Sequence, residues 1–368
     1  MADKRSHDSG EPSFLKTILD DLKSFFENMR RGVLKRTLRR DFKELRDFYF
    51  DEKRKSRLKG MCRFNRWIYT SAWLLKAFLL KLTSTRRILL VISLLFLLLS
   101  RNNSDNKPII GGLILLFVLL LELKDKLLAQ NELMAGHAVQ HALMPDRKPV
   151  VPGWELWLFS RPANEVGGDL VDYLQVNKNR FGVVLGDVAG KGLRAALLMA
   201  KLQATLRALI PDFASLGELG TKINKIIYRD GLPNSFASLV YLELQPHSGL
   251  LCVLNAGHLP PIAIKGAKIE EMQKGEPALG ILPEMTYTEQ RIELRKGDFL
   301  FAYSDGLTEA RNDQGDFFGE QRLLELLPKL IDFSAEEVGE RLLAEIDHFL
   351  GDVRANDDLS MVVLKRLD

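Results

Sequence analysis

The sequence predicts an α+β fold in which strands and helices form layers, preceded by a region that is helical throughout. After Pro152, short apolar runs bounded by glycine or proline are typical of strands. These runs come in neighbouring blocks without strict alternation with helices, which favours a layered sandwich over a doubly wound parallel sheet. Upstream, residues 12–59 alternate apolar and charged positions with helical spacing.

The N-terminal region is basic. Residues 1–87 contain 23 Lys or Arg and 11 Asp or Glu, a charge of +12, whereas the remainder contains 29 and 37, a charge of −8. Basic residues beside apolar segments typically face anionic lipid on the cytoplasmic side of a membrane. We prefer lipid to nucleic acid as the partner, because no zinc-finger spacing or RNA-binding aromatic motif accompanies the charge. Residues 1–82 are therefore predicted as a basic helical region, with 67–82 lying at the membrane interface.

Two almost purely aliphatic runs follow, Ile88–Leu99 and Ile109–Leu121, separated by the polar stretch 100–108. A pair of buried core helices is one interpretation, but neither run has the polar face that such helices usually show. Each run is shorter than the roughly 20 residues that usually span a bilayer, and flanking long side chains can extend it. We predict a hairpin of two short transmembrane helices over residues 83–123, with both ends in the cytoplasm.

Two further features bear on the compartment. Cys62 and Cys252 lie in different regions, so a disulfide framework is not expected and a reducing compartment fits. The polar segment Met1–Ser13 lacks the apolar core of a cleavable signal peptide. Both points agree with an inner-membrane protein whose C-terminal part faces the cytoplasm.

Residues 122–148 are predicted as a connector. Glu122–Met144 contains no proline and forms one continuous helical pattern, which Pro145 ends. An amphipathic helix packed on its own domain is the alternative. His137 and His141 are four residues apart, and we interpret them as surface or dimer contacts and not as metal ligands.

The C-terminal part is predicted to contain at least five strands and three helices. The strand runs are Val183–Leu185, Ala237–Leu242, Leu250–Leu254, Asp298–Tyr303 and Met361–Leu364. The helical stretches are Leu193–Ile210, Leu216–Tyr228 and Ala335–Leu350.

Four aspartates occur in short motifs spread over this part of the chain: Val-Gly-Gly-Asp169, Leu-Gly-Asp187-Val-Ala-Gly-Lys-Gly, Tyr-Ser-Asp305-Gly and Asn-Asp357-Asp-Leu-Ser. Glycine beside a carboxylate at the end of an apolar run lets the backbone turn sharply and approach an ion. Carboxylates with few histidines and no thiols suit Mg²⁺ or Mn²⁺. The motifs therefore predict a divalent-cation site of the kind that phosphoryl chemistry uses.

Together with Asn255-Ala-Gly-His-Leu-Pro-Pro261 and Pro277-Ala-Leu-Gly280, these motifs closely resemble the PPM-type metal-dependent serine/threonine phosphatases, in the bacterial branch typified by SpoIIE and RsbU. The resemblance covers roughly residues 140–368. It implies that residues 149–368 form an α-β-β-α sandwich, with two stacked, mainly antiparallel sheets flanked by helices. It also implies that the helix ending at Met144-Pro145 is a regulatory connector through which two chains can form a homodimer.

The resemblance further implies the roles of the acidic residues. Asp187 should bridge two Mn²⁺ or Mg²⁺ ions, with the carbonyl of Val188 assisting on one of them. Asp305 and Asp357 should hold one ion, and Asp169 should lie on the other side of the cluster. Asp187 and Asp305 are therefore the expected catalytic residues.

Several assignments near this cluster stay open. Asp358 is an alternative to Asp357 as a ligand, whereas Asp172 is interpreted as a surface carboxylate. The segment Gly190–Gly192 is interpreted as a tight strand-to-helix turn. His258 is assigned to substrate binding, either as an acid near the leaving group or, the preferred reading, as a hydrogen-bonded support. Arg161 is assigned to contact with substrate phosphate.

The implied function is a membrane-tethered phosphatase that hydrolyses phosphoserine or phosphothreonine in a partner protein. In the resembled branch, such substrates are usually anti-sigma-factor antagonists in bacterial partner-switching pathways. One alternative is a phosphatase-like scaffold or sensor without turnover, which the presence of all four aspartates disfavours. Another is a metal-dependent phosphoesterase with a non-protein substrate, which the absence of histidine-rich metal motifs disfavours.

Overall fold

The computed structural model describes residues 50, 57–58, 60–99, 106–231, 235–266, 268–351 and 353–368. The chain divides into a unit that ends at Asp125 and a larger unit, Lys126–Asp368. Most of residues 12–59, where helices are predicted, and most of the polar stretch 100–108 lie outside the described residues.

The larger unit contains two five-stranded sheets whose neighbouring strands are all antiparallel. The first, called the β1 sheet, has the order β1-β10-β9-β6-β7, and the second, called the β3 sheet, has the order β2-β3-β4-β5-β8. The strands are β1 (Trp154–Arg161), β2 (Leu170–Asn177), β3 (Arg180–Val188), β4 (Ala237–Leu244), β5 (Leu250–Ala256), β6 (Ile262–Lys265), β7 (Lys268–Glu271), β8 (Glu289–Glu293), β9 (Phe299–Tyr303) and β10 (Leu359–Arg366).

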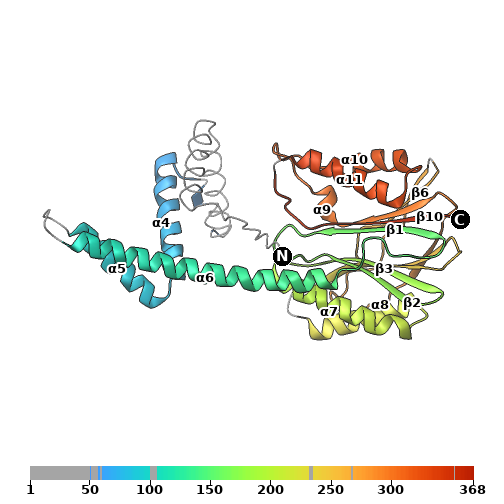
Figure 1. Cartoon of the computed structure of the whole chain (residues 1–368), viewed down its shortest axis with the longest axis horizontal. Coiled ribbons are helices and arrows are strands. Elements are labelled where there is room, and N and C mark those ends of the chain that lie inside the picture. Colours follow the sequence, from blue (N-terminus) through green and yellow to red (C-terminus); the bar gives the residue numbers. More distant parts are fainter. Residues whose placement is uncertain are drawn as a thin grey trace, which may run out of the picture. The chain divides into compact units, whose positions relative to one another are not determined.

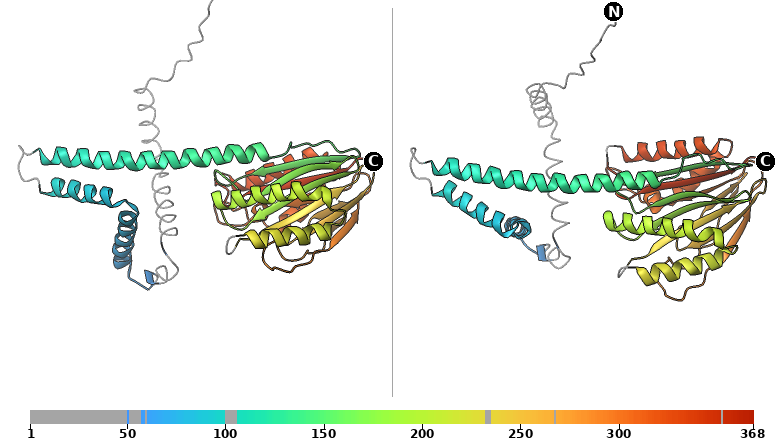
Figure 2. Two further views of the ribbon diagram at one scale, coloured as in Figure 1. Left: turned by 90° about the horizontal axis from the view of Figure 1, so that it is seen from below. Right: turned by 60° about the horizontal axis from the view of Figure 1, so that its bottom comes forward.

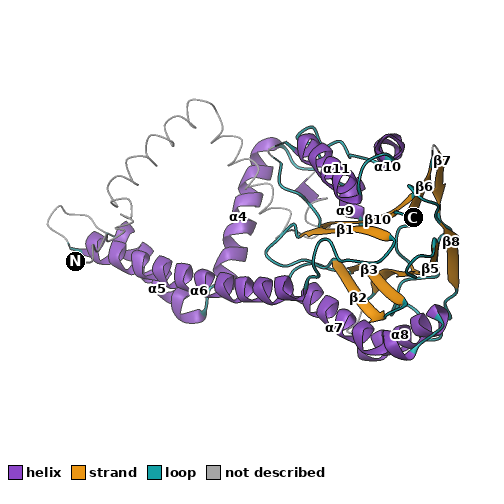
Figure 3. Ribbon diagram, turned by 45° about the vertical axis from the view of Figure 1, so that its right-hand side comes forward, coloured by secondary structure: helices purple, strands orange, loops and turns teal. Residues whose placement is uncertain are grey.

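A layer of helices covers the outer face of each sheet, as Figure 1 and Figure 3 show. Helices α9, α10 and α11 lie on the β1 sheet, and α7 and α8 lie side by side on the β3 sheet (Figure 2). The bounds are α7 (Leu193–Leu209), α8 (Leu216–Asp230), α9 (Asp305–Thr308), α10 (Glu320–Leu326) and α11 (Ala335–Leu350), with 3₁₀ turns η1 (Ile210–Asp212) and η2 (Leu327–Leu330).

Strand β3 explains why the sheets stack in this way. Val183 and Leu185 belong to the apolar core between the two sheets, whereas Val184 belongs to the core beneath α7 and α8. Successive side chains of a strand point to opposite faces, so an uninterrupted apolar run requires cover on both sides. The predicted α-β-β-α sandwich is confirmed.

The predicted elements agree with the structure, with small shifts at their ends. All five strand runs lie in strands, and the three helical stretches correspond to α7, α8 and α11. The first helix ends one residue early, where Pro211 introduces the 3₁₀ turn η1. Strands β1, β2, β6, β7 and β8 were not predicted; β7, for example, exposes all four of its residues and therefore has no apolar run.

The smaller unit contains α4 (Arg63–Lys81), α5 (Ser84–Leu98) and the start of α6 (Lys107–Leu143). Helices α5 and α6 pack closely, because the hydroxyl of Ser93 donates to the carbonyl oxygen of Gly111 at 2.8 Å. A Cβ atom on Gly111 would lie 2.9 Å from the carbonyl oxygen of Ser93. Arg86 pairs with Glu122 and Asp125 of α6, each at 2.7 Å. The two aliphatic runs thus form the expected helical pair.

The prediction that this pair crosses a membrane is not confirmed by the structure. None of the described helices combines the length and the apolar character that a membrane crossing requires. Helix α5 has 15 residues and is therefore about 22 Å long, against a hydrocarbon core of about 30 Å. In α6 the apolar stretch is followed by charged side chains from Glu122 onward.

Helix α6 also contains the predicted connector, and it runs without a break to Leu143. Pro145 follows its end, as expected from the sequence. His137 and His141 are exposed on it. Gln140, by contrast, is only 5% exposed.

Candidate active site

The four predicted aspartates all lie at or beside the ends of strands. Asp169 directly precedes β2, and Asp187 is the second-last residue of β3. Asp305 opens the short helix α9 just after β9, and Asp357 lies two residues before β10. Strands β2 and β3 belong to one sheet and β9 and β10 to the other, so the site is shared between the sheets.

Asp187 and Asp305 line the same cleft, whose volume is about 540 Å³. Burial and the nearby carboxylates of Asp305, Asp357 and Asp358 raise the pKa of Asp187 to about 6. Burial and the charges of Asp357 and Glu309 likewise raise the pKa of Asp305. Carboxylates that raise one another's pKa in this way are close and lack enough positive charge around them.

Asp169 is not among the described residues that line this cleft, and it is only 4% exposed. Burial raises its pKa well above the usual range, and the charges of Asp187 and Asp358 act in the same direction. Hydrogen bonds from Ser360 and Ser304 oppose this increase in pKa. Its Oδ2 atom is buried and has no hydrogen-bond partner among the described residues, which is costly unless another group, such as a cation, satisfies it.

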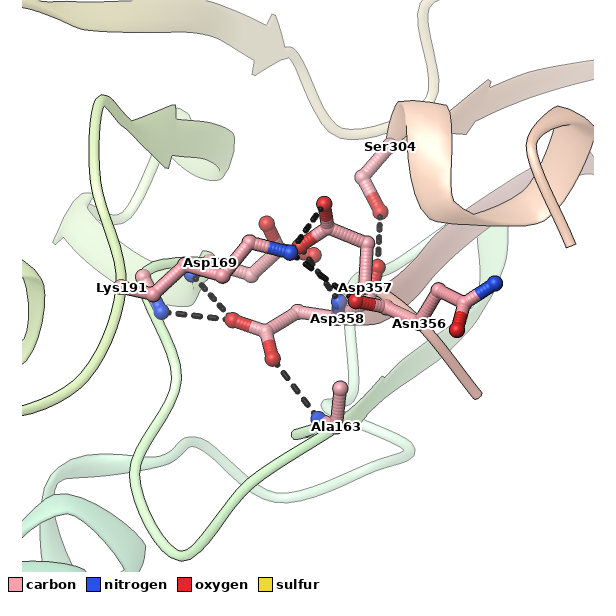
Figure 4. Close-up of polar contacts among 8 residues, drawn as sticks. Ala163, Asp169, Lys191, Ser304, Asn356, Asp357 and Asp358 are labelled. Atoms are coloured by element: carbon pink, nitrogen blue, oxygen red, sulfur yellow. Dashed lines mark hydrogen bonds and ion pairs between the residues drawn. The ribbon is translucent and has the colours of Figure 1, made fainter. Parts of the chain in front are cut away.

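Asp357 and its neighbour Asp358 have different surroundings, as Figure 4 shows. The ammonium group of Lys191 lies 2.8 Å from Oδ2 of Asp357 and also donates to the carbonyl of Asn356 at 2.9 Å. The carboxylate of Asp358 instead accepts backbone N–H bonds from Ala163 at 2.7 Å and from Gly168 at 2.6 Å. Asp358 therefore fixes the backbone that leads into Asp169.

Two glycines of the motifs permit close backbone approaches. A Cβ atom on Gly306 would lie 1.9 Å from the carbonyl oxygen of Asp358, so only glycine fits beside Asp305. A Cβ atom on Gly168 would lie 3.1 Å from the carbonyl oxygen of Val188 and 3.5 Å from Oδ1 of Asp187. The Val188 carbonyl and the Asp187 carboxylate thus both face the Gly-Gly-Asp loop.

These residues suit a divalent cation in their chemistry, because the donors are carboxylate and carbonyl oxygens. The orphaned Oδ2 atom of Asp169 and the mutual repulsion of Asp187 and Asp305 point to missing positive charge. As the side chains stand, however, no three His, Cys, Asp or Glu residues among those described form a ready ligand set. Asp357, for example, is turned to Lys191.

His258 lines the cleft and is 7% exposed. Burial lowers its pKa to about 4, so the imidazole is neutral at physiological pH. The side chain of Asn255 bonds both the N–H and the carbonyl of His258, at 2.9 Å and 3.1 Å. These features agree with the preferred interpretation, in which His258 is a hydrogen-bonded structural residue of the cleft.

Arg161 lies elsewhere. It forms a two-point ion pair with Asp347 of α11, the shorter contact being 2.7 Å, and it lines a different hollow. It does not belong to the described residues that line the cleft. Its contact with substrate phosphate therefore stays a prediction without support from this geometry.

The interpretation of Asp172 as a surface carboxylate is wrong, because its side chain is fully buried. The carboxylate accepts two hydrogen bonds from Arg207 of α7, at 2.8 Å and 2.6 Å. The Asp172–Arg207 ion pair connects β2 to α7.

The segment Gly190–Gly192 forms the tight strand-to-helix turn that was predicted. Gly190 and Gly192 both have positive φ, and α7 begins at Leu193.

Three residues that contribute to the site were missed or underrated: Asp358, Lys191 and Gln140. The side-chain amide of Gln140 donates to the carbonyl of Gly167 at 2.9 Å and accepts from its N–H at 3.1 Å. Gly167 begins the Gly-Gly-Asp motif, so the connector helix directly positions the loop that carries Asp169. The sequence pattern that predicted the connector helix does not indicate which of its residues makes such a contact.

The sequence is similar to a known protein family and to several known proteins. The family model of stage II sporulation protein E, SpoIIE, matches residues 177–367. Protein IcfG of Synechocystis is 28% identical over 265 residues, which cover 64% of this chain and 41% of IcfG. Phosphoserine phosphatase RsbU of Bacillus subtilis is 24% identical over 239 residues, covering 64% of this chain and 70% of RsbU. The match to phosphoserine phosphatase RsbP of the same organism covers 46% of that protein. The chain thus spans less than half of IcfG and of RsbP.

Solved structures share the fold. The crystal structure of the RsbU and RsbW domains of a Mycobacterium tuberculosis protein aligns with a TM-score of 0.51 and 26% identity, over 60% of this chain and 62% of that one. The PP2C domain of SiaA from Pseudomonas aeruginosa aligns with a TM-score of 0.58 and 19% identity, over 66% of this chain and 99% of that one. The two-sheet architecture is therefore that of the PP2C phosphatases.

Proposed function

The chain belongs to the SpoIIE family, and from this membership we propose that it is a phosphoprotein phosphatase that hydrolyses phosphoserine or phosphothreonine with the help of divalent cations. The observation that carries the proposal is the cleft in which Asp187 and Asp305 meet from two different sheets with too little positive charge around them. The names of RsbU and RsbP, both phosphoserine phosphatases, support the same reaction.

We assign the cations to Asp169, Asp187, the Val188 carbonyl, Asp305 and Asp357, with two Mn²⁺ or Mg²⁺ ions per site. Bound cations of this kind supply an activated water and neutralise charge on a phosphoryl group. The chain itself contributes the placement of the carboxylates. Asp358 and Gln140 hold the backbone around Asp169, and the glycine at position 306 lets Asp305 lie against the Asp358 backbone.

The substrate is proposed to be a phosphorylated protein of a bacterial partner-switching pathway, of the anti-sigma-factor antagonist type. The similarity to RsbU over 70% of that protein's length supports this class of partner. Within the cleft, the neutral His258 would support the wall beside the phosphoryl group and would not carry a charge.

We further propose that the smaller unit attaches the chain to the bacterial inner membrane, with the catalytic domain in the cytoplasm. Large apolar side chains of its helices are exposed, among them Trp67 at 64%, Leu98 at 79% and Leu113 at 61%. Such surfaces suit the apolar part of a lipid layer. In this proposal residues 1–82 contact lipid, 83–123 form the anchoring helical pair, 122–148 form the connector and a homodimer contact, and 149–368 form the phosphatase domain.

Activity is tested with the full chain on p-nitrophenyl phosphate and on a phosphoserine protein, with Mn²⁺ or with EDTA. We expect release of phosphate from both substrates with Mn²⁺ and none with EDTA. Turnover that survives chelation would exclude the proposed reaction, and a lack of turnover with Mn²⁺ would favour a scaffold.

Membrane attachment is tested separately by flotation with vesicles of neutral lipid and of neutral lipid mixed with anionic lipid. We expect the chain to float with both and more completely with anionic lipid, because residues 1–87 carry a charge of +12. A chain that stays at the bottom of the gradient with both kinds of vesicle would contradict attachment.

A further inference from the structure

The wall of the cleft contains large apolar side chains that remain exposed. Phe236 is 40% exposed and Leu259 is 37% exposed, although both line a concave surface. Pro260 and Pro277 also line this wall, so its backbone has little freedom. An exposed apolar surface inside a cleft is typical of a site where a ligand buries it.

The same cleft contains one cationic side chain among its described lining residues, that of Lys274. Lys274 is exposed, and its ammonium group has no hydrogen bond or ion pair with any described residue. The remaining charged lining residues are the carboxylates Asp187, Asp305 and Glu276, and Glu276 accepts a hydrogen bond from Thr288 at 2.6 Å. Lys274 is thus available to a negatively charged group brought in by the ligand.

Taking the phosphatase function above as given, we propose that this cleft selects its substrate by the residues that flank the phosphoserine. An apolar side chain next to the phosphoserine packs on Phe236 and Leu259, and an acidic side chain further along the segment pairs with Lys274. The occupant is therefore an extended phosphoserine segment of a protein, with apolar neighbours and at least one acidic residue.

The continuity of the cleft supports this occupant. Phe236, Leu259 and Lys274 line the same hollow as Asp187 and Asp305, so a segment with its phosphoserine at the carboxylates lies within reach of them. The volume of about 540 Å³ is within the usual range for ligand pockets and leaves room beside a phosphoryl group. The backbone on both sides is fixed: the carbonyl of Phe236 accepts from the N–H of Ala189 at 2.9 Å, and Leu259 follows the His258 turn.

The experiment uses the full chain with Mn²⁺ and three phosphoserine peptides. The parent peptide has leucine on both sides of phosphoserine and glutamate at the next position on each side. In the second peptide serine replaces both leucines, and in the third glutamine replaces both glutamates. The variants are Phe236→Ala, Leu259→Ala, Lys274→Ala and Lys274→Arg.

Matched controls are Ile269→Ala, whose side chain is also 40% exposed but lies on β7, and Lys296→Ala, an exposed lysine; neither residue lines the cleft. We expect Phe236→Ala and Leu259→Ala to lower kcat/KM for the parent peptide about tenfold and to leave the serine-flanked peptide unchanged. Lys274→Ala should lower kcat/KM about threefold for the two peptides that keep glutamate and leave the glutamine peptide unchanged, with recovery in Lys274→Arg. The controls and the hydrolysis of p-nitrophenyl phosphate should not change.

Equal effects of the variants on all three peptides, or none on any, would overturn the proposal. Binding of the corresponding phosphonate peptides, measured by fluorescence anisotropy, tests selection by the cleft independently of the reaction itself. If the wild type hydrolyses no peptide, the proposed function fails, yet a variant-specific loss of phosphonate-peptide binding still supports selection by the cleft. Phosphonate-peptide binding that does not depend on the flanking residues would overturn the proposal that the cleft selects its substrate.

Discussion

Two acidic regions of the molecule lie next to each other and differ in how their charge is satisfied. The carboxylate of Asp358 accepts short backbone N–H bonds from Ala163 and Gly168. Asp187 and Asp305 line an open cleft, where burial and the charges of neighbouring carboxylates raise their pKa values. The difference separates two tasks of one residue type: a satisfied carboxylate holds the backbone, and an unsatisfied one is available to a cation.

The largest effect is expected from the cleft. Asp187→Asn and Asp305→Asn should each lower kcat at least about 1000-fold, because each removes a charge that helps to hold the cations. Urea unfolding of the metal-free chain should show little loss of stability, since each change also removes repulsion. Asp313→Asn, at an exposed loop position, is the matched control and should keep full activity. Retained activity in both cleft variants would contradict the separation of tasks.

Replacement of Asp358 is expected to lower stability, unlike replacement of Asp187 or Asp305. Asp358→Ala leaves the buried N–H groups of Ala163 and Gly168 without partners and should lower the free energy of unfolding by about 3 kcal/mol. The measurement is urea unfolding of the metal-free chain, compared with Asp187→Asn. Equal stabilities of the two variants would show that Asp358 has no special structural role.

pH provides a third way to distinguish the regions. The folded pKa of Asp187 is about 6, above its ordinary value, so protonation of Asp187 stabilises the metal-free fold at low pH and this contribution is lost as pH rises through about 6. Protons also compete with the cation for this group. Apparent Mn²⁺ affinity should therefore be constant above about pH 7 and fall roughly tenfold per pH unit below about pH 6. Calorimetric titration with Mn²⁺ between pH 5 and 8 tests this, and a flat affinity would contradict it.

A smaller effect is expected from the connector. Gln140→Ala removes two hydrogen bonds to Gly167 and should weaken Mn²⁺ binding about fivefold, which corresponds to about 1 kcal/mol. Gln130→Ala, at an exposed position of the same helix, is the matched control. Calorimetric titration with Mn²⁺ measures both variants. An unchanged Mn²⁺ affinity in Gln140→Ala would show that the connector does not position the Asp169 loop.

Much of the fold and part of the site could be predicted from the sequence. Short apolar runs such as Val183–Leu185 come in neighbouring blocks without strict alternation with helices, and this order predicted the layered sandwich. Glycine beside Asp187 and Asp305 marked the strand ends that meet in the cleft. The exposed edge strand β7 gave no such pattern, because all four of its residues face solvent.

The division of labour within the site could not be predicted. Asp357 and Asp358 are adjacent and chemically identical, and only the path of the chain into β10 turns one toward Lys191 and the other toward Ala163. Gln140 contacts a loop 27 residues further along the chain, and nothing in the helical pattern marks it. The membrane crossing predicted from the aliphatic runs is not confirmed, because none of the described helices combines the length and apolar character that a crossing requires.

The most direct test of the acidic cleft is anomalous diffraction at the manganese edge from crystals of the chain grown with Mn²⁺. We expect two anomalous peaks between Asp187 and Asp305, with oxygen ligands from Asp169, Asp187, Val188, Asp305 and Asp357. Well-ordered carboxylates at this position without any anomalous density would contradict the account.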